Sequence, residues 1–358
     1  MLSTALTCLA LVAFILMTIG GNVLVCLAVG TSRRLHRISN CFVVSLAVTD
    51  LLLGLLVLPT TALLELRNGH WPLGGALCNI YITVDVMLCT ASIFNLLAIS
   101  IDRYLAISSP MHYMERVTPP RVAAAIAVIW VLSLALSILP VHLGWNTKDF
   151  RVQYQDWHIG DTKRDDWNCR YEWSNIYVLV NCFITFYIPL VVMCGTYLCI
   201  FRVARKQAQR IRAALPSLTR SSPANFTMRD YKATVTLAAV LGGFIVCWFP
   251  YFTFFIWMGL RNWKETPEIV HSVVLWLGYF NSVLNPIIYP SLNRDFRRAY
   301  SQLLCCRGSN QRNPPSLSSS STCLALQKRA GVCNGHQTAH AKNTILQSTS
   351  NSMDDQNK

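Results

Sequence analysis

Seven separate stretches of the chain are apolar over about 20 residues or more, the length that a helix needs to cross the hydrocarbon core of a membrane. Only 13% of the 358 residues are charged, whereas an ordinary soluble protein has about 25%. We therefore expect an all-α membrane protein, built as a bundle of seven transmembrane helices. The stretches, numbered here as spans one to seven, are residues 5–30, 41–65, 77–104, 121–143, 175–201, 233–258 and 269–290.

Basic residues are unevenly distributed between the connections, and this indicates the orientation of the spans. The segments that follow spans one, three, five and seven carry an excess of Lys and Arg, as in TSRRLHRISN after span one. By the positive-inside rule these segments are cytoplasmic, which puts the N-terminus outside the cell and the C-terminus in the cytoplasm. The net charge of +14 then reflects topology, with membrane lipid as the partner, and does not indicate binding to nucleic acid.

The composition changes near residue 309, where Ser, Asn, Gln and Thr become frequent. We expect a seven-transmembrane domain over residues 1–308, which ends in a short amphipathic eighth helix, and a disordered cytoplasmic tail over residues 309–358. The tail contains a run of hydroxyl residues, SLSSSST, as a target for phosphorylation. Cys305 and Cys306 lie beside basic residues at the membrane edge, which suits S-palmitoylation; the alternative is two free thiols.

Two of the 14 cysteines lie on the outer side in this topology. Cys78 is near the start of the third span, and Cys169 lies in the long connection between spans four and five. The outside is an oxidising compartment, so these residues either form a disulfide that holds the connection over the bundle or remain as unpaired thiols. The pattern favours the disulfide.

An acidic residue inside the third span is the feature that points most directly to function. Asp85 lies about 10 Å inward from Cys78, where a charge costs roughly 2.5–3.5 kcal/mol to insert. Arg103 follows 18 residues later, a whole number of helical turns, so both charges lie on one face, which must point into the bundle. No Lys or Arg lies at a similar depth, so a ligand ammonium group explains the carboxylate best; the alternative is a protonated or hydrated structural acid.

Aromatic and polar residues of other spans are expected at the depth of Asp85. Four aromatic residues around Pro250 share one helical stripe, which is either core packing or a cage for a flat cationic ligand. The stripe on the sixth span consists of Trp248, Tyr251, Phe252 and Phe255. The predicted site also includes two aromatic residues of the seventh span, Trp276 and Tyr279, and a polar pair on the fifth span, Asn181 and Thr185. Tyr279 is placed to hydrogen-bond Asp85.

Asp50 is a second acid inside a span. Side-chain oxygens of Ser92, Asn281, Ser282 and Asn285 are expected near it. Hard cations take oxygen ligands, so a bound Na⁺ ion is one prediction and ordered water is the other.

Short motifs spread along the chain are GN at 21–22, LAVTD at 46–50, DRY at 102–104, Trp130, Pro189, CWFP at 247–250 and NPIIY at 285–289. In this order they resemble the rhodopsin-like G-protein-coupled receptors, and Asp85 looks like the amine-binding aspartate of the aminergic branch. Longer runs, such as DVMLCTASI at 85–93 and CWFPYFT at 247–253, are most similar to the type-2 histamine receptors.

The resemblance implies histamine as ligand, a stimulatory heterotrimeric G protein that raises cyclic AMP, and regulation by arrestin and receptor kinases at the plasma membrane. It also implies a cytoplasmic switch, whose residues are Asp102, Arg103, Tyr104, Tyr197, Asp230 and Tyr289. The chain departs from the type-2 histamine receptors at Asn181, where those receptors carry an acid.

Other functions remain as alternatives. A receptor for serotonin or a trace amine would use the same aspartate, and Asn181 keeps that alternative open. An opsin needs a lysine in the seventh span, and residues 269–290 contain none. A channel or transporter would need charges along several spans, and the chain shows no nucleophile–base constellation or metal-ligand cluster that indicates an enzyme.

Overall fold

A computed structural model describes residues 2–67, 69–71, 73–147, 152, 169, 174–214, 223–261 and 268–304, all within one compact unit, Met1–Arg307. The described residues are nearly all helical, and seven helical segments are long and apolar enough to cross a membrane. Their bounds match the predicted spans to within a few residues, so the predicted seven-helix fold is confirmed. The predicted tail over 309–358 lies outside the described residues.

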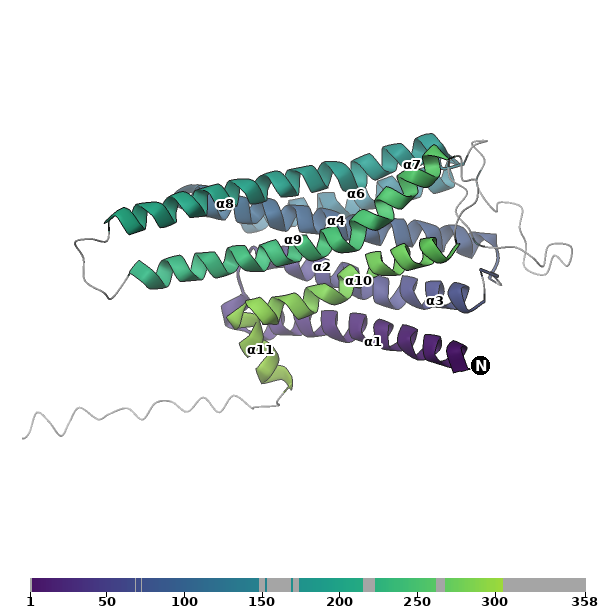
Figure 1. Ribbon diagram of the computed structural model, residues 1–358, viewed down its shortest axis with the longest axis horizontal. Helices are drawn as coiled ribbons and strands as arrows, with labels where there is room; N and C mark the ends of the chain where they lie inside the picture. Colours follow the sequence, from purple (N-terminus) through teal and green to yellow (C-terminus); the bar gives the residue numbers. More distant parts are fainter. Residues whose placement is uncertain are drawn as a thin grey trace, which may run out of the picture. The chain divides into compact units, whose positions relative to one another are not determined.

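The seven segments run side by side along the long axis in Figure 1. Five spans are single helices: α1 (Leu2–Thr31), α4 (Gly75–Ser108), α6 (Pro119–His142), α9 (Pro223–Leu260) and α10 (Glu268–Leu292). The second and fifth spans are each divided by a π-helical turn: α2 (Asn40–Leu52), Leu53–Val57 and α3 (Leu58–Leu66); α7 (Asn175–Cys182), Phe183–Tyr187 and α8 (Ile188–Ala214). Short helices lie between or after the spans: Arg33–Leu35, α5 (Pro110–Arg116) and α11 (Arg294–Leu304).

Both π-helical turns end just before a proline. The N–H of Leu58 donates to the carbonyl of Leu53, five residues back, and Pro59 follows. The N–H of Ile188 likewise donates to Phe183, and Pro189 follows. Proline has no N–H and its ring collides with the preceding turn, so a widened turn absorbs the disturbance without breaking the helix. Apolar length alone predicted these two spans as uninterrupted.

The surface of the bundle is apolar and its interior holds polar residues. On α6, Val128 and Val131 are 55% and 64% exposed, as expected of residues that face lipid. The acids Asp50 and Asp85 and the amide Asn95 are almost fully buried. This distribution is the reverse of a soluble protein, and it concentrates hydrogen-bonding groups between the helices.

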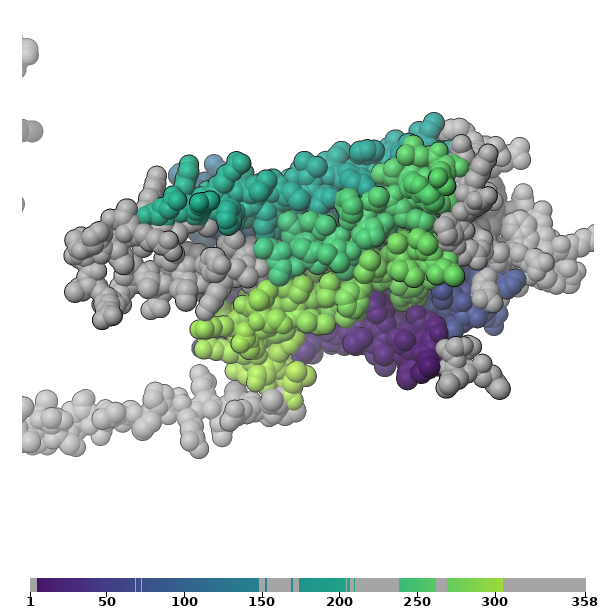
Figure 2. All heavy atoms as spheres, viewed as in Figure 1, coloured from purple at the N-terminus to yellow at the C-terminus, as the bar shows by residue number. Residues whose placement is uncertain are grey.

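Helices α1 and α10 pack against each other, and Figure 2 shows them adjoining on one face. A Cβ atom on Gly21 would lie 2.8 Å from the Pro286 ring, so only glycine fits there. The next residue, Asn22, donates its amide to the carbonyls of Thr18 (2.9 Å) and Ser282 (3.1 Å). The contact therefore fixes the position of α10 next to α1.

The predicted amphipathic eighth helix is α11. Its apolar side buries Phe296, Ala299 and Tyr300. Phe296 stacks on Tyr289 of α10, with ring centroids 5.4 Å apart, and the Tyr300 hydroxyl donates to the Pro286 carbonyl at 3.3 Å. These contacts join α11 to the end of the seventh span. The predicted palmitoylation sites, Cys305 and Cys306, lie outside the described residues.

Candidate functional site

The predicted disulfide is present between Cys78, near the start of α4, and Cys169, in the connection before α7. The two cysteines are 91 residues apart in sequence. In the chain-entropy view, closing so long a loop removes conformations from the unfolded chain and stabilises the fold by about 4–5 kcal/mol. The bond ties Cys169 to the first turn of α4.

A cavity of about 590 Å³, open space included, lies between α4, α7, α9 and α10. The structure brings seven of the predicted ligand-binding residues together there. The lining residues are Asp85, Val86, Cys89, Thr90, Ile93, Val178, Asn181, Cys182, Thr185, Trp248, Tyr251, Phe252, Phe255 and Leu275.

Asp85 is the one acidic residue of this lining, and its side chain is 4% exposed. The Tyr279 hydroxyl donates to its Oδ1 atom at 3.0 Å, which is the hydrogen bond that the sequence analysis suggested. The Cys89 thiol donates to the same atom at 3.5 Å. These donors orient the carboxylate. The arrangement places one acidic group in the wall of the cavity.

Aromatic rings of the fifth and sixth spans form a packed cluster that contributes to the lining of the cavity. Phe252 stacks almost parallel on Phe186, with centroids 4.3 Å apart, and Tyr251 packs on Phe255 at 4.5 Å. Trp248 meets Tyr251 edge to face at 5.6 Å. The rings therefore pack against one another, and the four rings of the predicted stripe also line the cavity; their role as a cage for a cationic ligand stays a prediction. Phe186 belongs to the cluster although the sequence analysis did not single it out.

The seventh span lines the cavity with a residue other than the two that were predicted. Leu275 is the α10 residue that lines the cavity. Trp276, predicted to join the cage, instead packs against Phe14 of α1, with centroids 5.5 Å apart. Successive helical residues are rotated by about 100°, so neighbours such as these face different sides. Tyr279 also does not line the cavity and acts through its hydrogen bond to Asp85.

Several lining residues were missed by the sequence analysis, but their spacing contained a signal. On α4, Cys89 lies four residues after Asp85, so it shares the same face. On the fifth span, Val178 and Cys182 lie on the stripe that already holds Asn181 and Thr185. Extending each stripe by one helical turn would have found them.

The fifth-span polar pair is linked internally. Thr185 lies in the π-helical turn, and its hydroxyl donates to the backbone carbonyl of Asn181 at 2.8 Å. That bond uses the hydroxyl proton of Thr185, so the hydroxyl offers the cavity an acceptor. The amide of Asn181 can both donate and accept. This part of the lining can therefore bind a polar group of a ligand.

Asp50 lies below this cavity among the residues predicted to hold an ion. Ser282 and Asn285 donate to its carboxylate at 2.8 and 2.9 Å, and Ser92 contacts it at 3.5 Å. Asp50 is 1% exposed and makes no ion pair among the described residues. The Asn281 amide, also buried, has no hydrogen-bond partner there. A buried carboxylate surrounded by hydroxyl oxygens fits the donor set that Na⁺ prefers.

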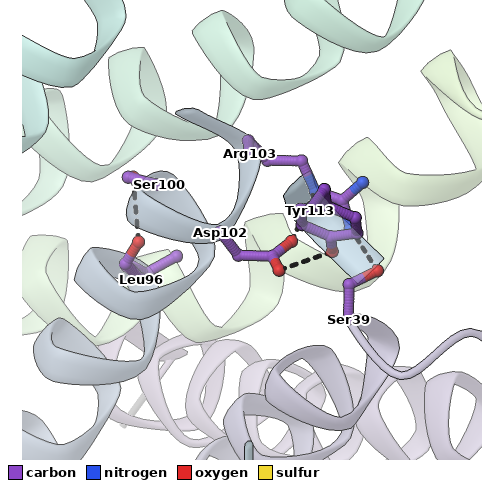
Figure 3. A network of polar contacts seen from close by, with 6 residues as sticks. All are labelled: Ser39, Leu96, Ser100, Asp102, Arg103 and Tyr113. Atoms are coloured by element: carbon purple, nitrogen blue, oxygen red, sulfur yellow. Dashed lines mark hydrogen bonds and ion pairs between the residues drawn. The ribbon is translucent and has the colours of Figure 1, made fainter. Parts of the chain in front are cut away.

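Figure 3 shows the polar network at the other end of α4. The Arg103 guanidinium donates to the Ser39 hydroxyl at 2.8 Å and lies 3.4 Å from the Asp102 carboxylate. Tyr113 of α5 donates to the same carboxylate at 2.7 Å. Burial and this bond raise the pKa of Tyr113 to about 12, so the hydroxyl keeps its proton at neutral pH. Ser39 and Tyr113 were not predicted, because nothing local in the sequence links them to Arg103.

The tyrosines of the predicted cytoplasmic switch differ in how deeply they are buried. Tyr289 is buried and stacks on α11, whereas Tyr104 and Tyr197 are half-buried. The predicted pair between Arg103 and Asp230 lies outside what the structure describes, because the side chain of Asp230 is not among the described residues.

Comparison with known proteins accords with this geometry. The sequence profile of the family "7 transmembrane receptor (rhodopsin family)" matches residues 21–289. The chain belongs to this family. It is therefore a multi-pass receptor of the plasma membrane rather than an enzyme. The profile covers every span except part of the first.

Individual relatives are similar over most of this receptor. It is 52% identical to the histamine H2 receptor of Homo sapiens over 301 residues, which are 84% of this chain and 80% of the relative. It is 51% identical to the histamine H2 receptor of Canis lupus familiaris over 316 residues, 88% of this chain and 84% of the relative. A D(1)-like dopamine receptor of Takifugu rubripes is 39% identical over 315 residues, 81% of this chain and 68% of the relative.

Proposed function

We propose that this receptor binds histamine and responds by activating a stimulatory G protein, which raises cyclic AMP. The observation that carries the proposal is the buried Asp85 carboxylate in a cavity that is also lined by aromatic rings and by the polar residues Asn181 and Thr185. The similarity to receptors named for histamine supports this amine over serotonin or a trace amine.

Histamine carries an ammonium group at one end and an imidazole ring at the other. In the proposed pose Asp85 takes the ammonium group, and the aromatic cluster covers the flat body of the ligand. Asn181 and Thr185 take the ring nitrogens, because together they offer a donor and two acceptors. A ligand of this kind satisfies both polar ends of the cavity at once.

The signal must then reach the cytoplasmic end of the bundle. Trp248 is a candidate for the first step, because its indole packs directly on Gly278, where a Cβ atom would lie 2.8 Å from the ring. A change in the position of Trp248 therefore moves α9 relative to α10. At the cytoplasmic end, the hydrogen bond from Arg103 to Ser39 belongs to the resting state, and the ligand shifts the population away from it.

Further partners follow from the same proposal. The N-terminus is extracellular, and the basic cytoplasmic segments lie against lipid headgroups. Receptor kinases phosphorylate the hydroxyl run of the tail, which then binds arrestin through its added negative charge. A Na⁺ ion held by oxygens of Asp50, Ser92 and Ser282 supplies positive charge to a buried carboxylate and stabilises the resting state.

A panel of amines applied to cells that express the full chain tests the proposal, with cyclic AMP as the readout. Histamine is expected to raise cyclic AMP at lower concentration than serotonin, tyramine or dopamine. A response to one of the other amines without a response to histamine would refute the histamine assignment. No response to any amine, with the receptor present at the cell surface, would refute the amine site itself.

A further inference from the structure

Two hydroxyl groups meet on the surface of the bundle, between the fifth and sixth spans. Tyr187 is the last residue of the second π-helical turn, and Thr253 lies on α9; their hydroxyl oxygens are 3.2 Å apart. Thr253 is exposed and Tyr187 is half-buried. Neither residue lines the amine cavity, so the proposed function does not use this pair.

The pair lies in the part of the surface that the hydrocarbon of the membrane covers. Both residues belong to segments long and apolar enough to cross a membrane, Asn175–Val203 and Ala238–Leu260. Thr253 is about two helical turns, or roughly 10 Å, from the end of its segment at Leu260. Hydrocarbon offers no hydrogen-bonding group, so a donor at this depth must find its acceptor in the protein or in a ligand.

The pair has one more proton than its own hydrogen bond uses. Each hydroxyl carries one proton, and whichever group donates, the other keeps a proton without an acceptor. Neither hydroxyl has a second hydrogen bond in the part of the chain that the structure describes. Thr60 shows the usual solution on a helix, since its hydroxyl donates to the Leu56 carbonyl, four residues back, at 2.9 Å. Thr253 makes no such bond among the described residues, which leaves one donor at the lipid-facing surface.

Aromatic rings flank the two hydroxyls on both helices. The centroid of the Tyr187 ring lies 5.4 Å from that of Phe183 and 6.5 Å from that of Phe249 on α9. Phe183 and Phe249 are 52% and 44% exposed, so their rings also face the membrane. We call Phe183, Tyr187, Phe249 and Thr253 together the hydroxyl patch. It combines a hydrogen-bond donor with flat apolar surfaces on either side.

We propose that the hydroxyl patch is a second ligand site, open to the membrane, for a small neutral aromatic molecule that carries a carbonyl group. The remaining hydroxyl proton donates to the carbonyl oxygen, and the aromatic body packs against Phe183 and Phe249. A charged ligand is excluded, because a charge is costly at this depth. A phospholipid suits the patch less well, because its ester carbonyls lie at the edge of the hydrocarbon and not inside it.

The hydroxyl patch is separate from the amine cavity, although only one layer of side chains divides them. Phe186 meets the Tyr187 ring edge to face at 5.1 Å and stacks on Phe252, which lines the cavity. A ligand at the patch therefore lies behind the aromatic cluster and does not compete with an amine for Asp85. The inference does not depend on which amine the receptor binds.

The test uses the full receptor in lipid nanodiscs and two aryl trifluoromethyl diazirines that differ in one group. The first probe carries an acetyl group, whose carbonyl accepts a hydrogen bond, and the second carries an ethyl group of similar size. Light releases N2 from each probe, and the resulting carbene inserts into a neighbouring bond of the protein. Peptide mass spectrometry measures labelling of residues 183–187 and 249–253, divided by labelling of the lipid-facing residues 128–132 of α6, which corrects for the amount of each probe in the membrane.

The acetyl probe should label the hydroxyl patch about two- to tenfold more than the ethyl probe after this correction. A neutral hydrogen bond contributes about 0.5–1.5 kcal/mol, and about 1.4 kcal/mol is a factor of ten. Equal corrected labelling by the two probes would overturn the inference, because the remaining proton would then be satisfied by the protein or by a lipid carbonyl.

Variants assign the preference to the two hydroxyls. The double variant Tyr187→Phe, Thr253→Val removes both hydroxyls, keeps the aromatic ring and nearly the same volume, and should abolish the preference for the acetyl probe. Thr60→Val is the matched control, because that hydroxyl is already bonded within its own helix and its loss should leave the preference unchanged. A preference that survives in the double variant would show that the hydroxyls do not hold the carbonyl.

Labelling in the presence of saturating histamine separates this site from the proposed function. The preference for the acetyl probe should persist, because the patch and the cavity have no residue in common. Loss of the preference with histamine would place the probe in the amine cavity and overturn the second site. A receptor that ignores histamine but shows the preference, and loses it in the double variant, would refute the histamine assignment alone.

Discussion

Replacing Asp85 with asparagine tests the centre of the proposed site. The Asp85 carboxylate is 4% exposed, so an ammonium group that reaches it forms an ion pair largely shielded from water. Removing one partner of such a pair costs about 3–5 kcal/mol. At about 1.4 kcal/mol per factor of ten, histamine affinity should fall by roughly two to nearly four orders of magnitude. Binding of radiolabelled histamine to membranes measures the loss, with cell-surface expression as the control for folding.

Tyr279 provides a graded version of the same perturbation. Its hydroxyl is fully buried and lies 3.0 Å from Oδ1 of Asp85. A hydrogen bond to a charged group contributes about 1.5–3 kcal/mol, so Tyr279→Phe should weaken histamine by roughly one to two orders of magnitude. Tyr187→Phe is the matched control, because that hydroxyl contacts Thr253 outside the cavity at 3.2 Å and should have a much smaller effect.

The double variant decides whether the tyrosine acts through the carboxylate. In the Asp85→Asn background the Tyr279 hydroxyl faces a neutral amide, and a neutral bond contributes only about 0.5–1.5 kcal/mol. The effect of Tyr279→Phe should therefore shrink by about 1–1.5 kcal/mol in that background. Fully additive effects would show that Tyr279 does not act through Asp85. An Asp85→Asn receptor that binds histamine within a factor of about three of the wild type would refute the ion pair, since about 3 kcal/mol is expected.

Three further variants test other parts of the structure. Asn181→Asp should lower the concentration of histamine needed for half-maximal cyclic AMP by about tenfold, because a charged acceptor contributes about 1–1.5 kcal/mol more than a neutral one; a weaker response would contradict the proposed position of the ring. Ser39→Ala removes the acceptor of the Arg103 hydrogen bond, which is partly exposed, and should raise ligand-independent cyclic AMP severalfold at equal expression. An unchanged basal signal would show that this bond does not hold the resting state. Gly278→Ala drives a methyl group into the Trp248 ring and should destabilise the purified receptor by about 1–3 kcal/mol in a thermal unfolding assay. Gly20→Ala, which meets no atom within 4 Å, should leave the unfolding temperature nearly unchanged.

Much of the site could be predicted because the relevant signals are local. Asp85 could be recognised because a charge in an apolar segment costs free energy to insert into the membrane. The aromatic stripe of the sixth span followed from helical spacing alone. The order of the motifs identified the family before any contact was known. Cys89 was not predicted to line the cavity, although its position four residues after Asp85 puts it on the same face of the helix.

Other features depended on contacts between distant parts of the chain. The bond from Arg103 to Ser39 joins residues 64 apart, and no pattern near either residue indicates it. Tyr113 approaches Asp102 only because α5 folds back on α4. Such polar pairs form between side chains that several helices bring together, so their existence depends on the packing of the whole bundle.

The sequence by itself determined the number of spans, their bounds to within a few residues and the acid that defines the site, because lipid penalises exposed polar groups wherever they occur along the chain. Only the tertiary structure decided that Leu275, and not its neighbour Trp276, faces the cavity, and that two spans widen into π-helical turns. The reason is physical: apolar length and charge act through each segment's own contact with lipid or water, whereas the rotation of a helix about its axis is set by the close packing of its neighbours.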